Sequence, residues 1–515
     1  MRLAVGALVV ALIGVAAYFR TAAAFLHPLW LDEAYSAYAA AQGWTFLWTV
    51  VPRYETHPPF YYSLVRLWTL GFGDSLAALR SLGVAASLLT LPIVVLAGQE
   101  LARILRPARP ALGVPLAALL LIALAPYPIA MADEVRPYPV LILVYAVACF
   151  ALLRIGRITA GGSAVPVRPL VLYLAALALM LWLHNMGPLY AVAMTLALAM
   201  LVLRRGLTGR DWRLLIGGHV VVGLIYLPGF LILVDQAPTW VSSTWLKFTT
   251  FALRWRLASL YVVATQLAAV AAGVLGLIAL VGLGRSGAGR RAAAALLVLA
   301  IVPVALSIGI SMWLAPVFIE RTMSAAAIPA LLLLAAAFGG VRWLRWPALA
   351  ALLLLAHQMA ELDWRRVPGR PAQNWYPAVR WLDARFRPGD LVFAYPNEGA
   401  LPFAYAVRDL GLTLPHRSIP TAVPTLDVQG GWYPTGSRGV ASLPRERLRA
   451  IAQAPEARAV PTIWLLRLGA NAYDVGDVFL DELGRGRVIV ARYKQGPIDI
   501  AGLRRIDVAE APPPR

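Results

Sequence analysis

The sequence predicts a polytopic α-helical membrane protein with a C-terminal α/β domain outside the membrane. Three observations support this fold class. The 515 residues are 60% hydrophobic and only 14% charged, whereas soluble proteins carry about 25% charged residues. Long apolar runs fill residues 1–360, and they stop after Ala360, where helix and strand patterns alternate. We therefore divide the chain into a membrane domain, residues 1–360, and a soluble domain, residues 361–515.

The membrane domain contains eleven apolar runs that suit membrane-spanning helices. Such a helix needs about 20 residues, with a range of about 17–25. The runs lie near residues 3–25, 80–101, 111–130, 138–153, 169–184, 186–203, 214–234, 260–283, 293–314, 323–340 and 346–360. We expect the first run to be retained, although Ala22–Ala24 is similar to a signal-peptide cleavage site. Phe60–Phe72 is also apolar, but its length and its Arg66 favour an interfacial helix.

Arginine clusters predict how the spans are oriented. Five loops between spans carry Arg103, Arg106 and Arg109; Arg154, Arg157 and Arg168; Arg204, Arg205, Arg210 and Arg213; Arg285, Arg290 and Arg291; and Arg342 and Arg345. With eleven spans and a cytoplasmic N-terminus, all five loops are cytoplasmic, as the positive-inside rule requires. We therefore expect an inner (plasma) membrane protein with an extracytoplasmic soluble domain. The net charge of +20 would suggest nucleic-acid binding in a soluble protein. Here much of the positive charge lies in the loops that we expect to be cytoplasmic, so we expect no nucleic-acid partner.

The acidic residues of the membrane domain fall on the opposite side. Only ten acidic residues precede Ala360, and this topology puts eight outside: Asp32, Glu33, Glu55, Asp74, Asp133, Glu134, Asp235 and Glu320. Acidic groups at membrane ends are costly and often functional. The outer face is therefore where we expect chemistry.

An adjacent acidic pair, Asp32 and Glu33, follows the first span. One carboxylate suits a general base for an attacking hydroxyl, and the other suits a metal, a sugar hydroxyl or an arginine. The alternative is a helix N-terminus, where acidic residues favour the macrodipole. Further along this loop, Pro58-Pro59 fixes an extended entry into the next helix and holds His57 in place. His57 suits a phosphate or metal contact, and a surface histidine is the alternative.

Cationic residues mark the later outside loops. Arg136, at the mouth of a span, suits a phosphate ligand because its guanidinium binds in bidentate fashion, and a structural salt bridge is the alternative. Arg321 is placed to meet an anionic lipid headgroup, unless it pairs with Glu320. His184 and Asn185 lie in an apolar hairpin, where we favour polar capping. Carboxylates, histidines and arginines on one face suit attack on a carbon that bears a phosphate leaving group.

These motifs, in this order over residues 1–340, resemble the bacterial protein-mannosyltransferase-like branch (family 39) of the GT-C membrane glycosyltransferases. This branch includes enzymes similar to the lipid A sugar transferases. Leu31–Ser36 resembles the first-loop acidic motif, His57–Tyr62 the His-Pro-Pro-Leu-Tyr-Tyr signature, and Asp133–Tyr138 the Gln-Glu-Ala-Arg-x-Tyr segment. His184 stands where the family often has Thr-His-Tyr, and Arg321 where Pro-Arg-Tyr is common. The chain departs from the pattern at three positions, Asp133, Asn185 and Thr322.

The resemblance implies a GT-C glycosyltransferase that uses a polyprenyl-phosphate-linked sugar donor and inverts the anomeric carbon. It implies an extracytoplasmic lipid, glycan or protein acceptor. Asp32 is then the base that activates the acceptor hydroxyl, and Glu33 supports it. The implied donor and substrate contacts are His57, Glu134, Arg136, Tyr138, His184 and Arg321. Metal dependence stays open, because the five candidate ligands Asp32, Glu33, Glu55, His57 and His184 have no diagnostic spacing for a divalent cation.

The helix and strand patterns of residues 361–515 predict a small α/β fold for the soluble domain. Trp375–Phe386 has the pattern of an amphipathic helix, and Pro388-Gly389-Asp390 that of a turn. Three segments have the pattern of strands, namely Leu391–Tyr395, Thr462–Leu466 and Arg487–Arg492.

Other classes of protein compete with this interpretation. A transporter or lipid flippase usually shows paired halves and polar residues at mid-membrane, and this sequence shows neither. A structural membrane protein would leave the outward acidic residues unexplained. An O-antigen-type ligase would use a diphosphate-linked donor, whereas the Asp32-Glu33 and His57-Pro58-Pro59 motifs favour the monophosphate branch.

Overall fold

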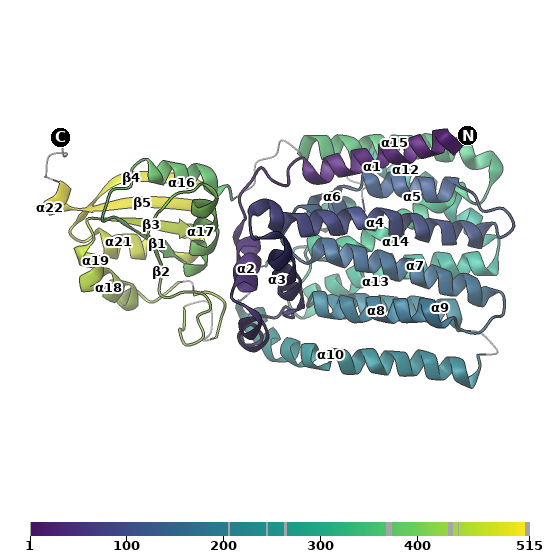
Figure 1. Ribbon diagram of the computed structural model, residues 1–515, viewed down its shortest axis with the longest axis horizontal. Helices are drawn as coiled ribbons and strands as arrows, with labels where there is room; N and C mark the ends of the chain where they lie inside the picture. The colour runs from purple at the N-terminus through teal and green to yellow at the C-terminus, as the bar shows by residue number, and fades with distance from the viewer. Residues whose placement is uncertain are drawn as a thin grey trace. The chain divides into compact units, whose positions relative to one another are not determined.

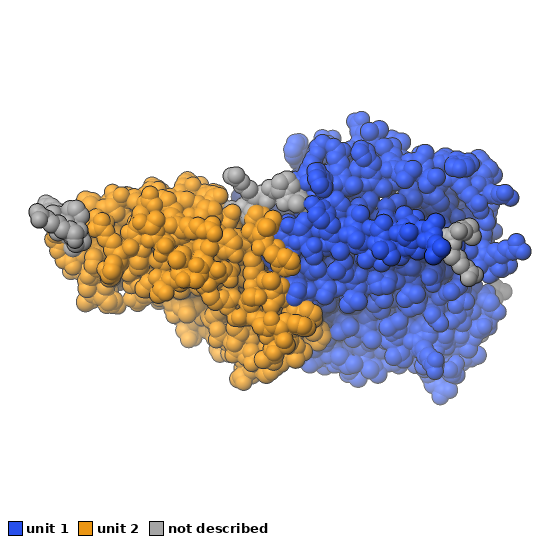
Figure 2. Space-filling model, turned by 45° about the horizontal axis from the view of Figure 1, so that its top comes forward, with its two compact units in different colours: residues 1–24, 80–233, 245–369 blue, residues 25–79, 234–244, 370–515 orange. Residues whose placement is uncertain are grey.

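The chain folds into two compact units (Figure 2). The computed structural model describes residues 2–203, 207–243, 246–261, 265–366, 373–430, 436–440 and 442–509. One unit, here the helical unit, comprises residues 1–24, 80–233 and 245–369. The other, the sheet unit, comprises residues 25–79, 234–244 and 370–515. The loop that follows the first predicted span therefore groups with the C-terminal α/β region.

The helical unit is built from long apolar helices that run roughly parallel (Figure 1). Its helices are α1 (Arg2–Thr21), α4 (Leu76–Leu105), α5 (Gly113–Ala123), α6 (Pro126–Ala132), α7 (Tyr138–Ala160), α8 (Val167–Leu183), α9 (Gly187–Val202), α10 (Gly209–Ser243), α11 (Leu253–Leu260), α12 (Gln266–Gly284), α13 (Gly287–Trp313), η3 (Glu320–Ala326), α14 (Ala327–Ala335), η4 (Ala336–Phe338), η5 (Arg342–Leu344) and α15 (Arg345–Arg366). The protein is a multi-pass membrane protein.

The number of clear spans is smaller than the predicted eleven. Within the described residues, seven helices are long and apolar enough to cross a membrane, or eight if α5 and α6, bent by 53°, count as one. The bend falls where Ala125 is extended before Pro126. Helices α8 and α9 have only 17 and 16 residues, which at about 1.5 Å per residue is short of a bilayer core of about 30 Å. Helix α15 ends in a charged segment, residues 361–366, which lowers its mean hydropathy.

Contacts join four of the five arginine-rich loops in the helical unit. Buried Glu100 pairs with Arg103 at 2.8 Å and with Arg157, which joins the first loop to the second. The Asp211 carboxylate accepts the Val165 N–H at 2.9 Å, which joins the second loop to the third. The Arg106 guanidinium donates to the Gly340 carbonyl at 2.8 Å, which joins the first loop to the fifth. These loops group together as expected. That they lie on the cytoplasmic side of the membrane stays a prediction. Arg204 and Arg205 lie outside the described residues.

The sheet unit holds a five-stranded mixed sheet in the order β2-β1-β3-β5-β4 (Figure 1). The strands are β1 (Leu391–Tyr395), β2 (His416–Ser418), β3 (Thr462–Leu468), β4 (Arg487–Gln495) and β5 (Ile498–Arg505). Strand β1 is parallel to β2 and β3, whereas β5 is antiparallel to β3 and β4. The predicted α/β fold is confirmed, with all three predicted strands present.

Helices cover both faces of this sheet. Trp375, Phe403 and Trp464 form a core with α16 (Trp375–Asp383) and α17 (Ala400–Asp409) on one face. Phe393 and Phe479 belong to a second core, which involves α18 (Arg445–Gln453), α19 (Pro455–Ala459) and α21 (Val478–Gly484). The unit also contains α2 (Leu31–Ala41), η1 (Phe46–Val50), η2 (Val51–Arg53), α3 (Phe60–Phe72), η6 (Asn397–Gly399), α20 (Ala470–Tyr473) and α22 (Ile506–Ala509).

Helix α2 is anchored on the α/β region of its own unit. The side chain of Leu31 packs against the first core, and the Leu31 N–H donates to the Gln373 side chain at 3.1 Å. The Tyr38 hydroxyl donates to the Val423 carbonyl at 2.7 Å. These contacts fix the first turn of α2, which carries Asp32 and Glu33.

Replacing Arg467 with methionine is expected to destabilise the sheet unit by about 3–5 kcal/mol, because it leaves buried carboxylates unpaired. Arg467 is fully buried on β3 and pairs with Asp474 at 2.8 Å and Asp499 at 3.1 Å. Thermal unfolding of the purified protein measures the loss. The matched control, Arg492→Met, removes a half-exposed partner of Asp499 at 3.0 Å and should cost less than about 1 kcal/mol. Equal losses in the two variants would contradict this account.

Candidate active site

The first turn of α2 presents the predicted acidic pair. Trp30 is extended and precedes the helix, so Asp32 and Glu33 lie at its positive end. The Glu33 carboxylate accepts the Trp30 N–H at 3.2 Å, and its side chain is 1% exposed. This is a helix-capping contact, which gives Glu33 a structural role at the start of α2. Asp32 is more accessible, with a side chain 18% exposed.

His57 lies in the loop before α3 and pairs with an acidic neighbour. Its Nδ1 is 2.8 Å from the Glu55 Oε1, and its backbone N–H donates to the same oxygen at 3.3 Å. The following residues, Pro58 and Pro59, lead directly into α3. The extended entry predicted for Pro58-Pro59 is not found at Pro59, which has helical backbone angles, and that the prolines position His57 stays a prediction. Glu55 is an additional orienting group for His57.

Arg438 joins these acidic side chains within the sheet unit, and it belongs to none of the sequence motifs. Its Nη2 is 3.4 Å from the Asp32 Oδ1, and its Nη1 is 3.7 Å from the Glu55 Oε2. Its Nε donates to Glu398, and its guanidinium lies 4.5 Å from the centre of the Tyr35 ring. One cation thus holds three carboxylates that lie far apart in the sequence.

The local fold accounts for this position of Arg438. Gly436, at φ +87°, starts the short turn before Arg438, and only glycine adopts that conformation without strain. A Cβ on Gly439 would lie 2.4 Å from the Glu398 side chain, so glycine is needed for the close approach. Burial alone would lower the pKa of Arg438, but Glu398, Asp32 and Glu55 raise it well above its usual value. Arg438 therefore stays charged at all ordinary pH values.

A second group of predicted residues gathers around Tyr138 in the helical unit. The guanidinium groups of Arg136 and Arg321 each lie 5.9 Å from the centre of the Tyr138 ring. The His184 ring is also 5.9 Å from that ring, between centres. Tyr138 begins α7, His184 follows α8, and Arg321 belongs to η3, so three segments converge. Glu134 precedes Arg136 by two residues and is partly buried.

Arg136, Arg321 and His184 are here called the cationic group, and hydrogen bonds orient parts of it. The Met186 N–H donates to Nδ1 of His184 at 3.0 Å, so the neutral imidazole carries its proton on Nε2. The Tyr190 hydroxyl donates to the Thr322 carbonyl at 2.9 Å, which fixes the segment after Arg321. Glu320, the residue before Arg321, pairs with Arg256 at 3.2 Å. His184, expected to be a helix cap, is also part of the group around Tyr138.

Metal ligation finds no support in the geometry of the candidate ligands. Among the residues that the structure describes, no three histidine, cysteine, aspartate or glutamate side chains are arranged to hold a metal ion. Asp32 and Glu55 contact a guanidinium, Glu33 caps a helix, and His57 pairs with Glu55.

Comparisons with known proteins identify the fold. No family model and no curated protein matches the chain. The crystal structure of ArnT from Cupriavidus metallidurans in the apo state matches with a TM-score of 0.60 and 15% identity, over 97% of this chain and 98% of that one. ArnT bound to undecaprenyl phosphate matches with a TM-score of 0.58 and 16% identity, over 98% and 99% of the two chains.

A third solved structure is an archaeal protein. The oligosaccharyltransferase AglB from Archaeoglobus fulgidus, in complex with an inhibitory peptide and a dolichol-phosphate, matches with a TM-score of 0.51 and 13% identity. The match covers 98% of this chain and 74% of AglB. These proteins are GT-C glycosyltransferases, and the chain has their fold, as its ordered motifs predicted.

Proposed function

We propose that the protein is an inverting glycosyltransferase that moves a sugar from a polyprenyl-phosphate-linked donor to an extracytoplasmic lipid, glycan or protein. The observation that carries the proposal is the convergence of Arg136, Arg321 and His184 on the Tyr138 ring. Two guanidinium groups and an imidazole donor form a site for an anionic phosphate. The GT-C fold supports it, because similar structures contain undecaprenyl phosphate or a dolichol-phosphate.

In the proposed reaction, Asp32 accepts the proton of the acceptor hydroxyl as that oxygen attacks the anomeric carbon. The new carbon–oxygen bond forms as the bond to the donor phosphate breaks, and its electron pair goes to the phosphate oxygen. The products are a glycosylated acceptor of inverted configuration and a polyprenyl phosphate. Glu33 acts indirectly, by fixing the first turn of α2 that carries Asp32.

The cationic group stabilises the leaving phosphate, which gains negative charge as the bond breaks. Arg136 and Arg321 supply fixed positive charge, and His184 supplies a hydrogen-bond donor on Nε2. Both guanidinium groups lie 5.9 Å from the centre of the Tyr138 ring, and an aromatic ring is a favourable partner for cations. Glu134 and His57 complete the proposed substrate contacts. We further propose that this chemistry occurs at the outer face of the inner membrane, with the arginine-rich loops in the cytoplasm.

Replacing Arg438 with glutamine is expected to lower kcat by about 10- to 100-fold with a smaller change in KM, because Asp32 loses its fixed position. Arg438→Lys should recover part of kcat, since it restores the charge without the planar fork. The matched control is Arg417→Gln, whose arginine is half-exposed and pairs with Glu456 at 3.5 Å. A purely structural role would lower the folded fraction but leave kcat per folded molecule unchanged, and that result would remove Arg438 from the mechanism.

A deletion strain tests the function directly. Mass spectrometry of its envelope glycolipids, glycans and glycoproteins should show the loss of one sugar from one class of acceptor. The wild-type gene should restore that sugar, and the Asp32→Asn gene should not. An unchanged glycan profile would contradict the proposed function.

A further inference from the structure

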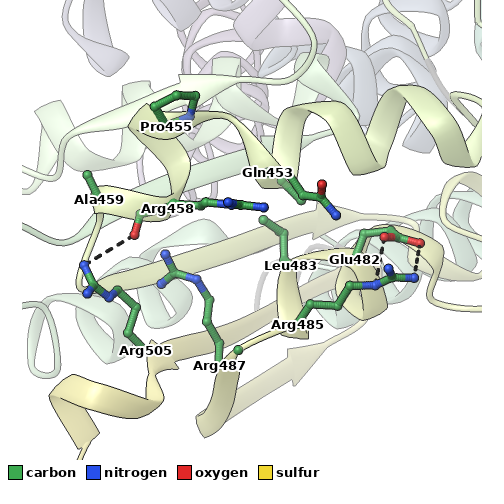
Figure 3. Close-up of a pocket in the computed structure, with 11 residues that line it drawn as sticks. Gln453, Pro455, Arg458, Ala459, Glu482, Leu483, Arg485, Arg487 and Arg505 are labelled. Atoms are coloured by element: carbon green, nitrogen blue, oxygen red, sulfur yellow. Dashed lines mark hydrogen bonds and ion pairs between the residues drawn. The ribbon is translucent and has the colours of Figure 1, made fainter.

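The sheet unit has a hollow lined mainly by arginine. Its volume is about 540 Å³, and its charged and polar lining residues are Gln453, Arg458, Glu482, Arg485, Arg487 and Arg505 (Figure 3). These residues come from α18, α19, α21, β4 and β5 and from the turn after α21. None of them belongs to the two groups of the candidate active site. Four arginines and one glutamate therefore line this space.

The one lining carboxylate is already shared among several cations. Glu482 has a fully buried side chain and pairs with Arg445 at 3.2 Å, Arg449 at 3.3 Å and Arg485 at 3.1 Å. A single negative charge cannot neutralise three guanidinium groups. This corner of the hollow therefore has an excess of positive charge.

Arg487 brings a further cation that no carboxylate contacts among the described residues. Its guanidinium donates to the carbonyls of Ala457 at 2.7 Å, Val460 at 2.8 Å, Leu503 at 3.1 Å and Pro461 at 3.3 Å. Carbonyl dipoles hold the group in place without cancelling its charge. Burial, and to a smaller extent the nearby Arg505, lower the pKa of Arg487, whereas Asp507 raises it.

Arg458 is the arginine best placed to accept a ligand. Its side chain is exposed and extends along the hollow toward Gln453 (Figure 3), and no side-chain partner is recorded for it within the described part of the chain. Arg505, by contrast, pairs with Asp507 and donates to the Arg458 carbonyl at 3.5 Å. The arginines that are held by protein contacts thus make the electrostatic potential of the hollow positive, and Arg458 remains available to bind a ligand.

We propose that this hollow binds a phosphate monoester, with Arg458 as the principal ligand and Arg487 and Arg485 as fixed charges behind it. Guanidinium forks match phosphate geometry, and a hollow of this size holds a phosphorylated sugar or headgroup rather than a bare ion alone. The site would hold a phosphorylated envelope molecule against the sheet unit. It is separate from the proposed donor-phosphate residues and does not depend on the transferase activity.

A fluorescent label at the rim of the hollow provides the test. Cys149 is the only cysteine and is buried, so Gln453→Cys in the full-length protein can be labelled selectively. Titration with a hexose phosphate should give a saturable signal, and sodium chloride of equal ionic strength should not. Arg458→Gln should weaken binding by about 10- to 100-fold, the usual value of a charge-assisted hydrogen bond. The control Arg447→Gln removes an exposed arginine of α18 outside the hollow and should leave the affinity unchanged.

A second arm distinguishes the source of the phosphate. Phosphatidylcholine vesicles with and without phosphatidic acid present the same monoester on a lipid. A response to hexose phosphate alone assigns the site to a soluble or glycan phosphate, and a response to phosphatidic acid assigns it to a lipid headgroup. No saturable response to either, or equal losses in Arg458→Gln and Arg447→Gln, would overturn the proposal.

Discussion

Replacing Asp32 with asparagine is expected to lower the rate of sugar transfer by about 10²- to 10⁴-fold, the usual contribution of a general base. Asparagine keeps the shape of the side chain but cannot accept the proton of the acceptor hydroxyl. The fold should survive, because the Asp32 carboxylate is partly exposed and its ion pair with Arg438 is long, at 3.4 Å. Initial rates with saturating donor measure the effect.

Asp74→Asn is the matched control for this substitution. Asp74 belongs to the same unit, is 67% exposed, and pairs with Arg408 at 2.7 Å. It should retain wild-type transfer. Wild-type turnover by Asp32→Asn would remove Asp32 as the base, and a loss confined to Glu33→Gln would move that role to Glu33.

Replacing Arg321 with glutamine is expected to lower kcat by about 10²- to 10³-fold, as the loss of one preorganised group at a developing negative charge usually does. The effect should fall mainly on kcat, because the charge on the leaving phosphate grows in the transition state. Arg136→Gln should act similarly, and the double variant should lose less than the product of the two effects, because both arginines serve the same group.

Arg256→Gln is the control for the arginine variants. Arg256 lies on α11 and pairs with Glu320, the neighbour of Arg321, at 3.2 Å. Its removal changes the same loop without touching the Tyr138 ring contacts. A loss in Arg256→Gln as large as in Arg321→Gln would mean that the loop, rather than the Arg321 charge, matters.

Local patterns were enough to predict most of the fold. Phe60–Phe72 is a helix over the predicted residues, and Leu391–Tyr395 is a strand over the predicted residues, because each has a continuous apolar pattern. Strand β2 was missed because it has only three residues, His416–Ser418, which are polar and not buried. The span count was too high because apolar composition does not show where a helix bends or ends, as at Pro126.

The candidate site could be predicted only in part. Motifs identified Arg136, His184 and Arg321, which the structure brings to one aromatic ring. Arg438 could not be predicted, because it lies 406 residues from Asp32 among many other arginines of the soluble domain. The only local feature of the sequence that marks Arg438 is the pair of glycines Gly436 and Gly439, which tighten the turn around it.

The measurement that tests the central claim most directly is the release of polyprenyl phosphate by the purified protein. The protein in lipid nanodiscs is mixed with a polyprenyl monophosphate sugar and an acceptor extract from the deletion strain, and the products are quantified by mass spectrometry. We predict equal amounts of polyprenyl phosphate and glycosylated acceptor with the wild-type protein, and neither with Asp32→Asn. Transfer only from a diphosphate-linked donor, or transport of the intact donor without sugar transfer, would contradict the account.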